Sequence, residues 1–334
     1  MIIRTREENE FYQLDPGLVL DSVEEALAPV KPGVRATGRT LTLNSLENRV
    51  YEIEMEDGSS VVAKFYRPGR WTREQILEEH MFLLALQDAE IPAIAPLRMG
   101  ATTLAETPGN ILFTVFPKVR GRLRDELSEP QIETLGRYLA RIHAVGRGLQ
   151  FRHRAPLDAE TFGWKPLGFL LENGFIDLTY ERRYRETVEA ILSAAEEPLR
   201  KARKQVVHGD CHLGNVLWDG ESPFFLDFDD SAVAPAVQDV WMVVNGRGED
   251  AERDRALLLH GYDTMGAPFD RSSLALIESL RALRMIHYAA WIARRWNDPT
   301  FQRTFPDFPE PTWWEDEVTA LEEVLRLIRG SSPS

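Results

Sequence analysis

Residues 206–218 read VVHGDCHLGNVLW and residues 224–230 read FFLDFDD, and these two stretches decide the fold. In both, polar residues with reactive side chains stand between short apolar segments that are typical of β-strands. This pattern places the functional groups on a loop and on the turn after a strand. Catalytic residues concentrate on such loops, because rigid strands hold them in position.

The spacing of acidic and amide residues here is that of phosphoryl-transfer enzymes. Such enzymes hold the γ-phosphoryl group and its metal while one carboxylate accepts the proton of an acceptor hydroxyl. Protein kinases place an Asn five residues after the catalytic Asp, and later the Asp of a D-F-G sequence. Asp210 and Asn215 keep this spacing, and Asp227 precedes Phe228. Asn215 and Asp227 offer the hard oxygen ligands that Mg²⁺ prefers, which leaves Asp210 to orient the acceptor.

An upstream β-hairpin is predicted to supply a basic residue for this chemistry. Residues 51–55 alternate between apolar and acidic side chains, residues 57–58 form an Asp-Gly turn, and residues 61–66 form the returning strand. Lys64 stands in that second strand, where kinases keep the lysine that contacts the nucleotide phosphates.

The acidic partner of Lys64 is expected on the next helix. That helix should begin near Thr72, because residues 72–75 form a capping-box sequence. Glu79 is the favoured partner, since it lies on a helix stripe that is otherwise apolar. Glu78 stays open, because an error of one residue in the helix register would exchange the two.

The apolar period divides the chain into two parts. A short helix is expected at residues 16–28 and a strand at residues 111–116, which ends at Pro117. The polar residues 118–122 form the candidate hinge. Helices are expected beyond it, around residues 135–142, 274–296 and 313–328. We expect an α+β, two-lobed, protein-kinase-like fold, with a small antiparallel sheet and a helix in an N-terminal nucleotide-binding lobe (1–117), a larger helical catalytic and substrate lobe (118–330), and a disordered tail (331–334).

Composition limits the class of protein. The 334 residues include 39 basic and 53 acidic side chains, for a net charge of −14, and 43% are hydrophobic. This is the profile of a globular protein of about two domains. The acidic balance argues against nucleic-acid binding, which needs a surplus of Lys and Arg. The N-terminus is too polar for a signal peptide, and no apolar run reaches the length of a membrane span. A cytoplasmic protein that does not bind membranes is therefore expected.

Several stretches resemble the aminoglycoside phosphotransferase and choline kinase superfamily, and over nearly the whole chain they resemble a subfamily of bacterial serine/threonine protein kinases within it. They are NSLEN at residues 44–48, KFYRP at residues 64–68, HGDCHLGN at residues 208–215, LDFDD at residues 226–230, PAVQDVWM at residues 235–242 and ARRW at residues 293–296. The resemblance implies ATP and Mg²⁺ as co-substrate and cofactor, and protein Ser/Thr hydroxyls as acceptors. It also implies that Asp210 is the catalytic acceptor, that Asn215 and Asp227 are the metal ligands, and that Ser45 belongs to the ATP site.

The chain departs from the wider kinase pattern in its phosphate-binding loop. Residues 44–48 contain no glycine, whereas kinases use G-x-G-x-x-G at this place. The side chains of Asn44 or Ser45 are therefore expected to donate to the phosphates where other kinases use backbone.

Three alternatives remain open. The acceptor could be a small alcohol of the homoserine, choline or aminoglycoside type, since nothing in the residues excludes it. His208, Asp210 and His212 alternate and could instead be the ligands of a metallo-hydrolase, although Lys64 and Glu79 would then have no role. A nucleotide-binding scaffold without activity is the third.

Other residues near the motif have structural interpretations. His208 and Asp239 are expected to hold the catalytic loop by hydrogen bonds, and Cys211 to be a small buried spacer. Asp229 could assist the metal or be solvated, and Asp230 is expected to be solvated. Tryptophans 291, 296, 313 and 314 are expected to pack between helices.

Overall fold

The computed structural model describes Phe11 and residues 14–330, and the predicted tail at 331–334 lies outside this range. The chain forms two compact units, each built from several segments. The first contains residues up to 131, 144–154 and 211–231. The second contains residues 132–143, 155–210 and 232–334. The expected boundary after residue 117 stays a prediction.

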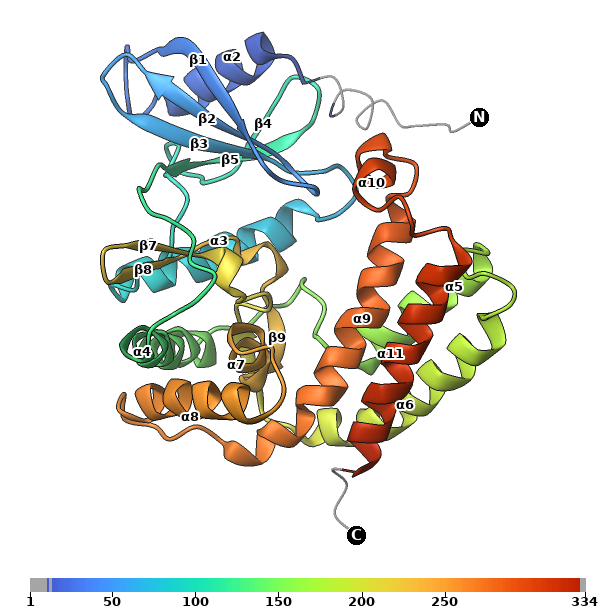
Figure 1. The fold of residues 1–334 in the computed structure, drawn as a ribbon. Helices are drawn as coiled ribbons and strands as arrows, with labels where there is room; N and C mark the ends of the chain where they lie inside the picture. Colours follow the sequence, from blue (N-terminus) through green and yellow to red (C-terminus); the bar gives the residue numbers. More distant parts are fainter. Residues whose placement is uncertain (1–10, 12–13, 331–334) are drawn as a thin grey trace. The chain divides into compact units, whose positions relative to one another are not determined.

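The first unit is built on a five-stranded antiparallel sheet (Figure 1). Its strands lie in the order β1-β2-β3-β5-β4 and span Ala36–Leu43 (β1), Arg49–Met55 (β2), Ser60–Phe65 (β3), Ala105–Glu106 (β4) and Leu112–Pro117 (β5). The predicted hairpin is present as β2 and β3, in which Val50 faces Lys64 and Ile53 faces Val61. Gly58 at its turn has a φ of 78°, which only glycine adopts without steric cost.

Helix α2 (Pro16–Leu27) covers one face of this sheet. Its buried residues Val19, Val23 and Leu27 pack in one cluster with Ile53 of β2 and with other residues of the sheet. The predicted helix is therefore confirmed to within one residue. Its first turn is closed by Asp15, whose carboxylate accepts a hydrogen bond from the N–H of Leu18.

Helix α3 (Arg73–Asp88) begins with the capping box that the sequence predicted. Thr72 accepts from the N–H of Gln75, and the side chain of Gln75 accepts from the N–H of Thr72. The predicted stripe that contains Ile76 is buried, whereas the neighbouring stripe is partly exposed at Leu77 and Met81. Glu78 and Glu79 are both buried on this helix, which marks the face that carries the site described below.

A second hairpin belongs to the first unit. Strands β7 (Val216–Asp219) and β8 (Ser222–Phe225) pair antiparallel directly after a 3₁₀ turn at Leu213–Asn215 (η2) and before another at Phe228–Asp230 (η3). The open end of this hairpin thus carries both motifs, because HGDCHLGN ends where β7 begins and LDFDD follows β8.

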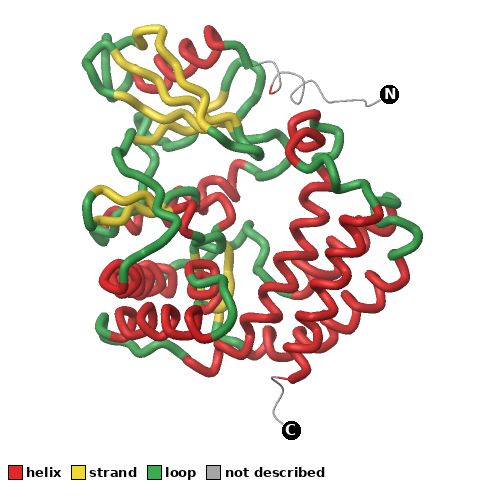
Figure 2. The backbone as a smooth tube through the Cα atoms, viewed as in Figure 1, coloured by secondary structure: helices red, strands yellow, loops and turns green. Residues whose placement is uncertain are grey.

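The second unit is mostly helical (Figure 2). Its helices α5 (Lys165–Glu172), α6 (Glu181–Lys201), α9 (Ile277–Arg294) and α11 (Pro311–Gly330) lie side by side. The unit also contains β6 (Lys204–Val207) paired with β9 (Ala232–Pro235), most of α4 (Glu129–Arg147), α7 (Val237–Val243), α8 (Glu249–Asp263), α10 (Pro299–Thr304), a π-helical segment η1 (Glu160–Trp164) and a 3₁₀ segment η4 (Arg271–Leu276).

Aromatic side chains pack between these helices, as predicted for the tryptophans. Trp314 of α11 is fully buried and lies edge-on to Tyr184 of α6, with ring centroids 5.4 Å apart. Trp296 and Trp313 pack on Phe308, and Trp291 packs on Phe301.

Helices α4 and α8 approach each other at two glycines. A Cβ placed on Gly136 would lie 1.9 Å from the carbonyl oxygen of Leu258, and one on Gly261 would lie 2.1 Å from the carbonyl oxygen of Glu133. No side chain fits between the two backbones at this crossing.

The α+β class is confirmed, and the differences from the sequence interpretation are local. Strand β1 was not predicted, and its burial does not alternate, since its six central residues are exposed and only its two ends are half-buried. Helix α6 was also missed, although its buried residues 184, 188, 191, 192, 195 and 199 follow the helical period and could have found it. The long helix expected at 274–296 divides into η4 and α9. No helix within the described residues has the length and apolar character to cross a membrane.

Glu317 of α11 gives a prediction about stability. Its Oε1 atom is buried and has no hydrogen-bond partner within the described part of the chain. Burial raises the pKa of this carboxyl from 4.5 to about 8. The folded chain therefore keeps a proton that the unfolded chain releases, so this group's contribution to the free energy of unfolding falls as pH rises from about 4.5 to 8.

We expect Glu317→Gln to remove this contribution. The variant should gain stability over the natural chain between pH 5 and pH 8, by up to ~4 kcal/mol at ~1.4 kcal/mol per pKa unit, in urea unfolding at each pH. The exposed neighbour Asp316, changed to Asn, is the control and should show no such trend. A stability difference that does not change with pH would contradict the prediction.

Candidate active site

Lys64 is the centre of a buried ion network in the first unit. Its Nζ lies 3.0 Å from Oδ1 of Asp229, 3.1 Å from Oδ1 of Asp227 and 3.8 Å from Oε1 of Glu79. Only 8% of the Lys64 side chain is exposed, whereas 56% of the Asp227 side chain is exposed. One wall of the network therefore opens to solvent at Asp227.

The two neighbouring glutamates of α3 have different partners. Glu79 is the acid beside Lys64, and its Oε2 also lies 3.2 Å from Nη2 of Arg154. Glu78 instead accepts hydrogen bonds from the backbone N–H groups of residues 152–154. The register of the helix thus assigns the ion pair to Glu79 and a loop-holding role to Glu78.

Asp229 is buried, which excludes the solvated one of the two alternatives that the sequence left open for it. Its side chain is 4% exposed and lies between Lys64 and Arg70, with 2.9 Å between Oδ2 and Nη1 of Arg70. Asn48 also donates to it at 3.4 Å. Asp230, in contrast, is 46% exposed, and it pairs with the largely buried Arg70.

Arg154 is a member of the network that sequence reasoning missed. It is 4% exposed, stacks over the ring of Trp71 and donates to the backbone carbonyls of Gln75, Asp229 and Ser231. It sits in the loop after α4, where nothing in the surrounding sequence distinguishes it from a solvated arginine.

The charges of the network stabilise one another. Burial alone would lower the pKa of the Lys64 ammonium, but the three carboxylates around it raise that pKa well above its ordinary value. Burial would raise the pKa of Asp229, but Arg70, Lys64 and Arg154 hold it well below the usual range. For Glu79, burial outweighs Lys64 and Arg154, so its pKa is raised.

Hairpin β7–β8 brings Asn215 close to Asp227 in the first unit. The N–H of Leu226 donates to the carbonyl of Asn215 at 2.9 Å, so Asp227 follows directly on the residue bonded to Asn215. The backbone of Asp227 is left-handed, with a φ of 52°, a conformation that Asp tolerates better than most residues. The two side chains supply an amide and a carboxylate oxygen, the donor types that suit Mg²⁺. The residues present therefore fit the predicted ion.

Ser45 has a structural role in its loop. Its hydroxyl accepts a hydrogen bond from the N–H of Asn48 at 3.2 Å, which is typical of a serine in a turn. Its expected place in the ATP site stays a prediction.

Asp239 holds the loop of Asp210 in the second unit. The carboxylate of Asp239 is fully buried and accepts from the N–H groups of His208 at 3.0 Å and Gly209 at 2.9 Å, and it pairs with His143. These hydrogen bonds and the His143 imidazole lower its pKa against the effect of burial. The Nδ1 atom of His208 accepts from the N–H of Asp210 at 3.3 Å. Both residues therefore have the loop-holding role that the sequence indicated.

Asp210 itself forms an ion pair with helix α9. Its Oδ1 lies 2.7 Å from Nη2 of Arg284, whose side chain is 41% exposed, while that of Asp210 is 18% exposed. Sequence reasoning gave no role to Arg284.

Two further interpretations of the motif concern Cys211 and a metal-binding group. Cys211 is fully buried, as expected for a spacer. Within the described residues, no three His, Cys, Asp or Glu side chains gather as a metal-binding group of the kind that the metallo-hydrolase alternative needs.

Comparison with known proteins assigns the family. The model of the phosphotransferase enzyme family, APH, matches residues 40–277, which include Lys64, Asp210 and Asp227. The chain belongs to this family. It is accordingly a phosphotransferase, as the spacing of the motif predicted.

Curated relatives match this phosphotransferase over nearly its whole length. Stress response kinase A of Escherichia coli (strain K12) is 35% identical over 320 residues, which is 96% of this chain and 95% of the relative. The serine/threonine protein kinase RdoA of Salmonella typhimurium is 34% identical over 319 residues, which is 95% of this chain and 94% of the relative. The bacterial kinases that the sequence resembles thus include proteins named stress response kinase A and serine/threonine protein kinase RdoA.

Solved structures share the fold at low sequence identity. The amicoumacin kinase hAmiN, in complex with AMP-PNP, Ca²⁺ and Ami, has a TM-score of 0.67 and 20% identity over 89% of this chain and 90% of its own. A microcompartment-associated aminopropanol kinase has a TM-score of 0.61 and 16% identity over 92% of this chain and 99% of its own. These similarities confirm the kinase-like fold of the phosphotransferase.

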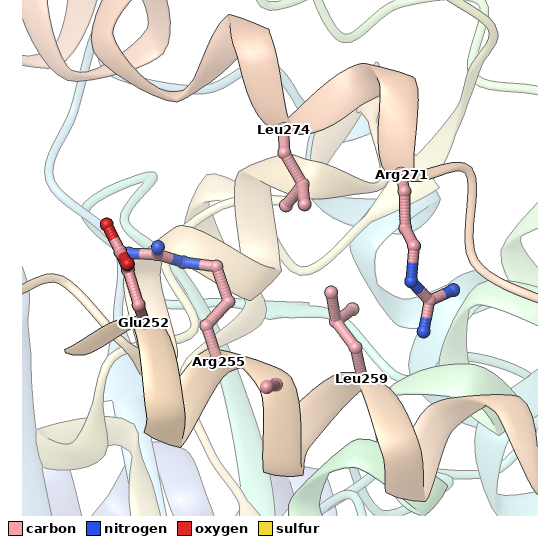
Figure 3. Close-up of a pocket in the computed structure, with 6 residues that line it drawn as sticks. Glu252, Arg255, Leu259, Arg271 and Leu274 are labelled. Atoms are coloured by element: carbon pink, nitrogen blue, oxygen red, sulfur yellow. The ribbon is translucent and has the colours of Figure 1, made fainter. Parts of the chain in front are cut away.

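The second unit contains a cavity of about 280 Å³ (Figure 3). None of the predicted site residues lines it. It is lined by Glu252, Arg255, Ala256, Leu259, Arg271 and Leu274. Arg271 is paired with Asp263, and Arg255 donates to the carbonyls of residues 244 and 246. Because both arginines have protein partners, the cavity gives no independent indication of a ligand.

The buried carboxylate of Asp229 predicts a large difference between two adjacent residues of this phosphotransferase. We expect Asp229→Asn to lower the free energy of unfolding by about 3–5 kcal/mol, because it leaves buried cations with one carboxylate fewer. Asp230→Asn is the matched control and should cost less than about 1 kcal/mol, since the Asp230 side chain is half exposed and Arg70 keeps its ion pairs with Glu47 and Asp229. Urea unfolding measures both, and equal losses would contradict the assignment.

Proposed function

We propose that this phosphotransferase is an ATP- and Mg²⁺-dependent serine/threonine protein kinase. The observation that carries the proposal is that Glu79 and Asp227 both form ion pairs with Lys64. Glu79 follows Lys64 by 15 residues in the sequence, and Asp227 follows it by 163 residues. A lysine held by a helix glutamate beside a metal-binding aspartate is the arrangement that kinases use for nucleotide phosphates.

Lys64 contacts the phosphates of ATP in this proposal. Its ammonium keeps its proton, because three carboxylates surround it, and it therefore supplies a fixed positive charge. Glu79 holds the ammonium in place through their ion pair. Ser45 donates to the nucleotide from the glycine-free loop at residues 44–48.

Asn215 and Asp227 hold Mg²⁺ in this proposal. The solvent exposure of Asp227 supports the assignment, since a metal that arrives with its nucleotide needs an accessible carboxylate. The chemistry that the ion supplies, when bound, is neutralisation of charge on the phosphate oxygens.

Asp210 accepts the proton of the acceptor hydroxyl. The hydroxyl oxygen forms a bond to the γ-phosphorus, and the bond from that phosphorus to the β–γ bridging oxygen breaks. The proton passes to the Asp210 carboxylate, and the products are ADP and a phosphate monoester. The hydrogen bonds of Asp239 and His208 fix the loop, so that this carboxylate is positioned before the acceptor arrives.

The choice of a protein acceptor rests on relatives of which one is named a serine/threonine protein kinase. A small alcohol is the second candidate, favoured by structural neighbours named amicoumacin kinase and aminopropanol kinase. Incubation of the pure chain with γ-labelled ATP and Mg²⁺, with Ser- and Thr-containing peptides or with a small-alcohol panel, separates the two. Label on peptides supports the proposal, and label on small alcohols alone overturns it.

We expect Asp210→Asn to lose phosphoryl transfer and keep nucleotide binding. The amide cannot accept the hydroxyl proton, so kcat should fall by about 10²–10⁴-fold. ATP affinity, measured by calorimetry, should remain nearly unchanged. Asp254→Asn, a surface change on α8, is the control for the loss of one acid. Turnover of the variant at the natural rate would refute the role of Asp210.

Asp227→Ala should instead weaken metal-dependent nucleotide binding. Loss of a carboxylate ligand should reduce the affinity for the Mg²⁺–nucleotide complex by at least about tenfold, with a smaller effect on metal-free nucleotide. Titration of nucleotide at several Mg²⁺ concentrations measures the difference, and Asp230→Ala is the control. An unchanged dependence on Mg²⁺ would count against Asp227 as a ligand.

A further inference from the structure

The ion pair between Arg284 and Asp210 places a positive charge beside the proposed catalytic carboxylate. The two residues belong to the second unit, and Nη2 of Arg284 lies 2.7 Å from Oδ1 of Asp210. Any acceptor hydroxyl that gives its proton to Asp210 must therefore come within a few ångströms of the Arg284 guanidinium. The charge of Arg284 acts on whatever stands next to that hydroxyl.

Arg284 has capacity for a second partner. A guanidinium carries five N–H donors in a planar fork, and one contact with Asp210 leaves others available. The Arg284 side chain is 41% exposed. Within the described residues, its ion-pair partner is Asp210. Its neighbour Arg281 differs in this respect, since it is 17% exposed, pairs with Glu278 and lies over the ring of Trp241.

The surroundings of Arg284 on α9 do not offset its charge toward an incoming group. Tyr288, one turn further along the helix, is 43% exposed. It is uncharged at neutral pH, because its ordinary pKa is 10 and burial raises that pKa further. Its ring stacks on that of Trp291, with 5.5 Å between the ring centroids, and this contact restricts the movement of the Tyr288 side chain. The acid that acts on Tyr288 from α11 is Glu317, whose raised pKa keeps it largely protonated.

We infer that the acceptor carries a negatively charged group beside its hydroxyl, and that Arg284 binds this group. The inference rests on the proposed function and names its acceptor class: a Ser or Thr flanked by Asp or Glu. A cationic neighbour would meet the like charge of Arg284 at short range. This local charge acts more strongly than the net charge of −14, which salt screens beyond about 8 Å and which by itself would favour cationic acceptors.

Arg284 thus determines specificity, and Asp210 carries the chemistry. When an acceptor carboxylate binds to the outer donors of Arg284, the guanidinium can keep its contact with Asp210 and link the two carboxylates. The hydroxyl is then oriented at the catalytic acid by an interaction that a basic or neutral sequence cannot make.

The test compares three peptides that differ only beside one Ser, with Glu, Gln or Lys as the flanking residues. With the natural chain, γ-labelled ATP and Mg²⁺, kcat/KM should be about fivefold to tenfold higher for the Glu peptide than for the Gln peptide, and lowest for the Lys peptide. The advantage should appear in KM and should shrink as ionic strength rises.

Arg284 variants distinguish specificity from a structural role. Arg284→Gln should make the Glu and Gln peptides nearly equivalent, Arg284→Lys should retain part of the preference, and Arg284→Glu should favour the Lys peptide. Arg182→Gln is the matched control, because Arg182 is exposed on α6 and pairs with Glu186 of the same helix. Its preference among the peptides should equal that of the natural chain.

Each remaining outcome has a defined meaning. Equal use of all three peptides by the natural chain, or a preference that survives Arg284→Gln, overturns this inference and leaves the proposed function intact. If label reaches small alcohols alone, the protein acceptor fails, and hydroxy acids should still be used in preference to amino alcohols of equal length. Absence of transfer to every acceptor overturns both proposals.

Discussion

A buried carboxylate must be compensated where it lies, and Asp229 sets this requirement for the first unit. Its compensation comes from Lys64 of β3, from Arg70 in the loop after that strand and from the amide of Asn48. Segments far apart in the sequence are thereby tied to one charge. Removal of one partner would leave the others buried without balance, so the group acts as a unit. The same network is open to solvent at Asp227, beside the buried ammonium of Lys64.

In the second unit, backbone N–H groups help to compensate a buried carboxylate. Asp239 is as deeply buried as Asp229, but backbone N–H groups of residues 208 and 209 provide much of its compensation, together with His143. Charge-assisted bonds to backbone fix the path of a loop, whereas ion pairs fix side chains. The difference fits what each carboxylate holds, which is the backbone of the loop before Asp210 in one unit and the side chain of Lys64 in the other.

Local patterns could be predicted from the sequence, and long-range partners could not. The capping box at Thr72, the turn at Gly58 and the spacing of Asp210 and Asn215 are contained in a few consecutive residues. The first two led to the right helix and hairpin, and the third led to the right family. The burial of Asp229, the stacking of Arg154 and the pairing of Arg284 with Asp210 depend on residues more than seventy positions away. A solvated and a buried arginine look the same in a single sequence. Strand β1 was missed for a different reason, since its polar and apolar residues alternate over only four positions, 40–43, and its central residues are exposed.

The crossing of α4 and α8 has a mechanical consequence. Packed helices usually slide past each other by small changes in the rotamers of the side chains between them. At Gly136 and Gly261 that intervening layer is missing, and the backbones stand against each other. Sliding of one helix along the other would bring carbonyl groups of one backbone into the other helix, so we expect the two helices to move together as one rigid unit. Any change of conformation in this unit would therefore take place at contacts other than the one between α4 and α8.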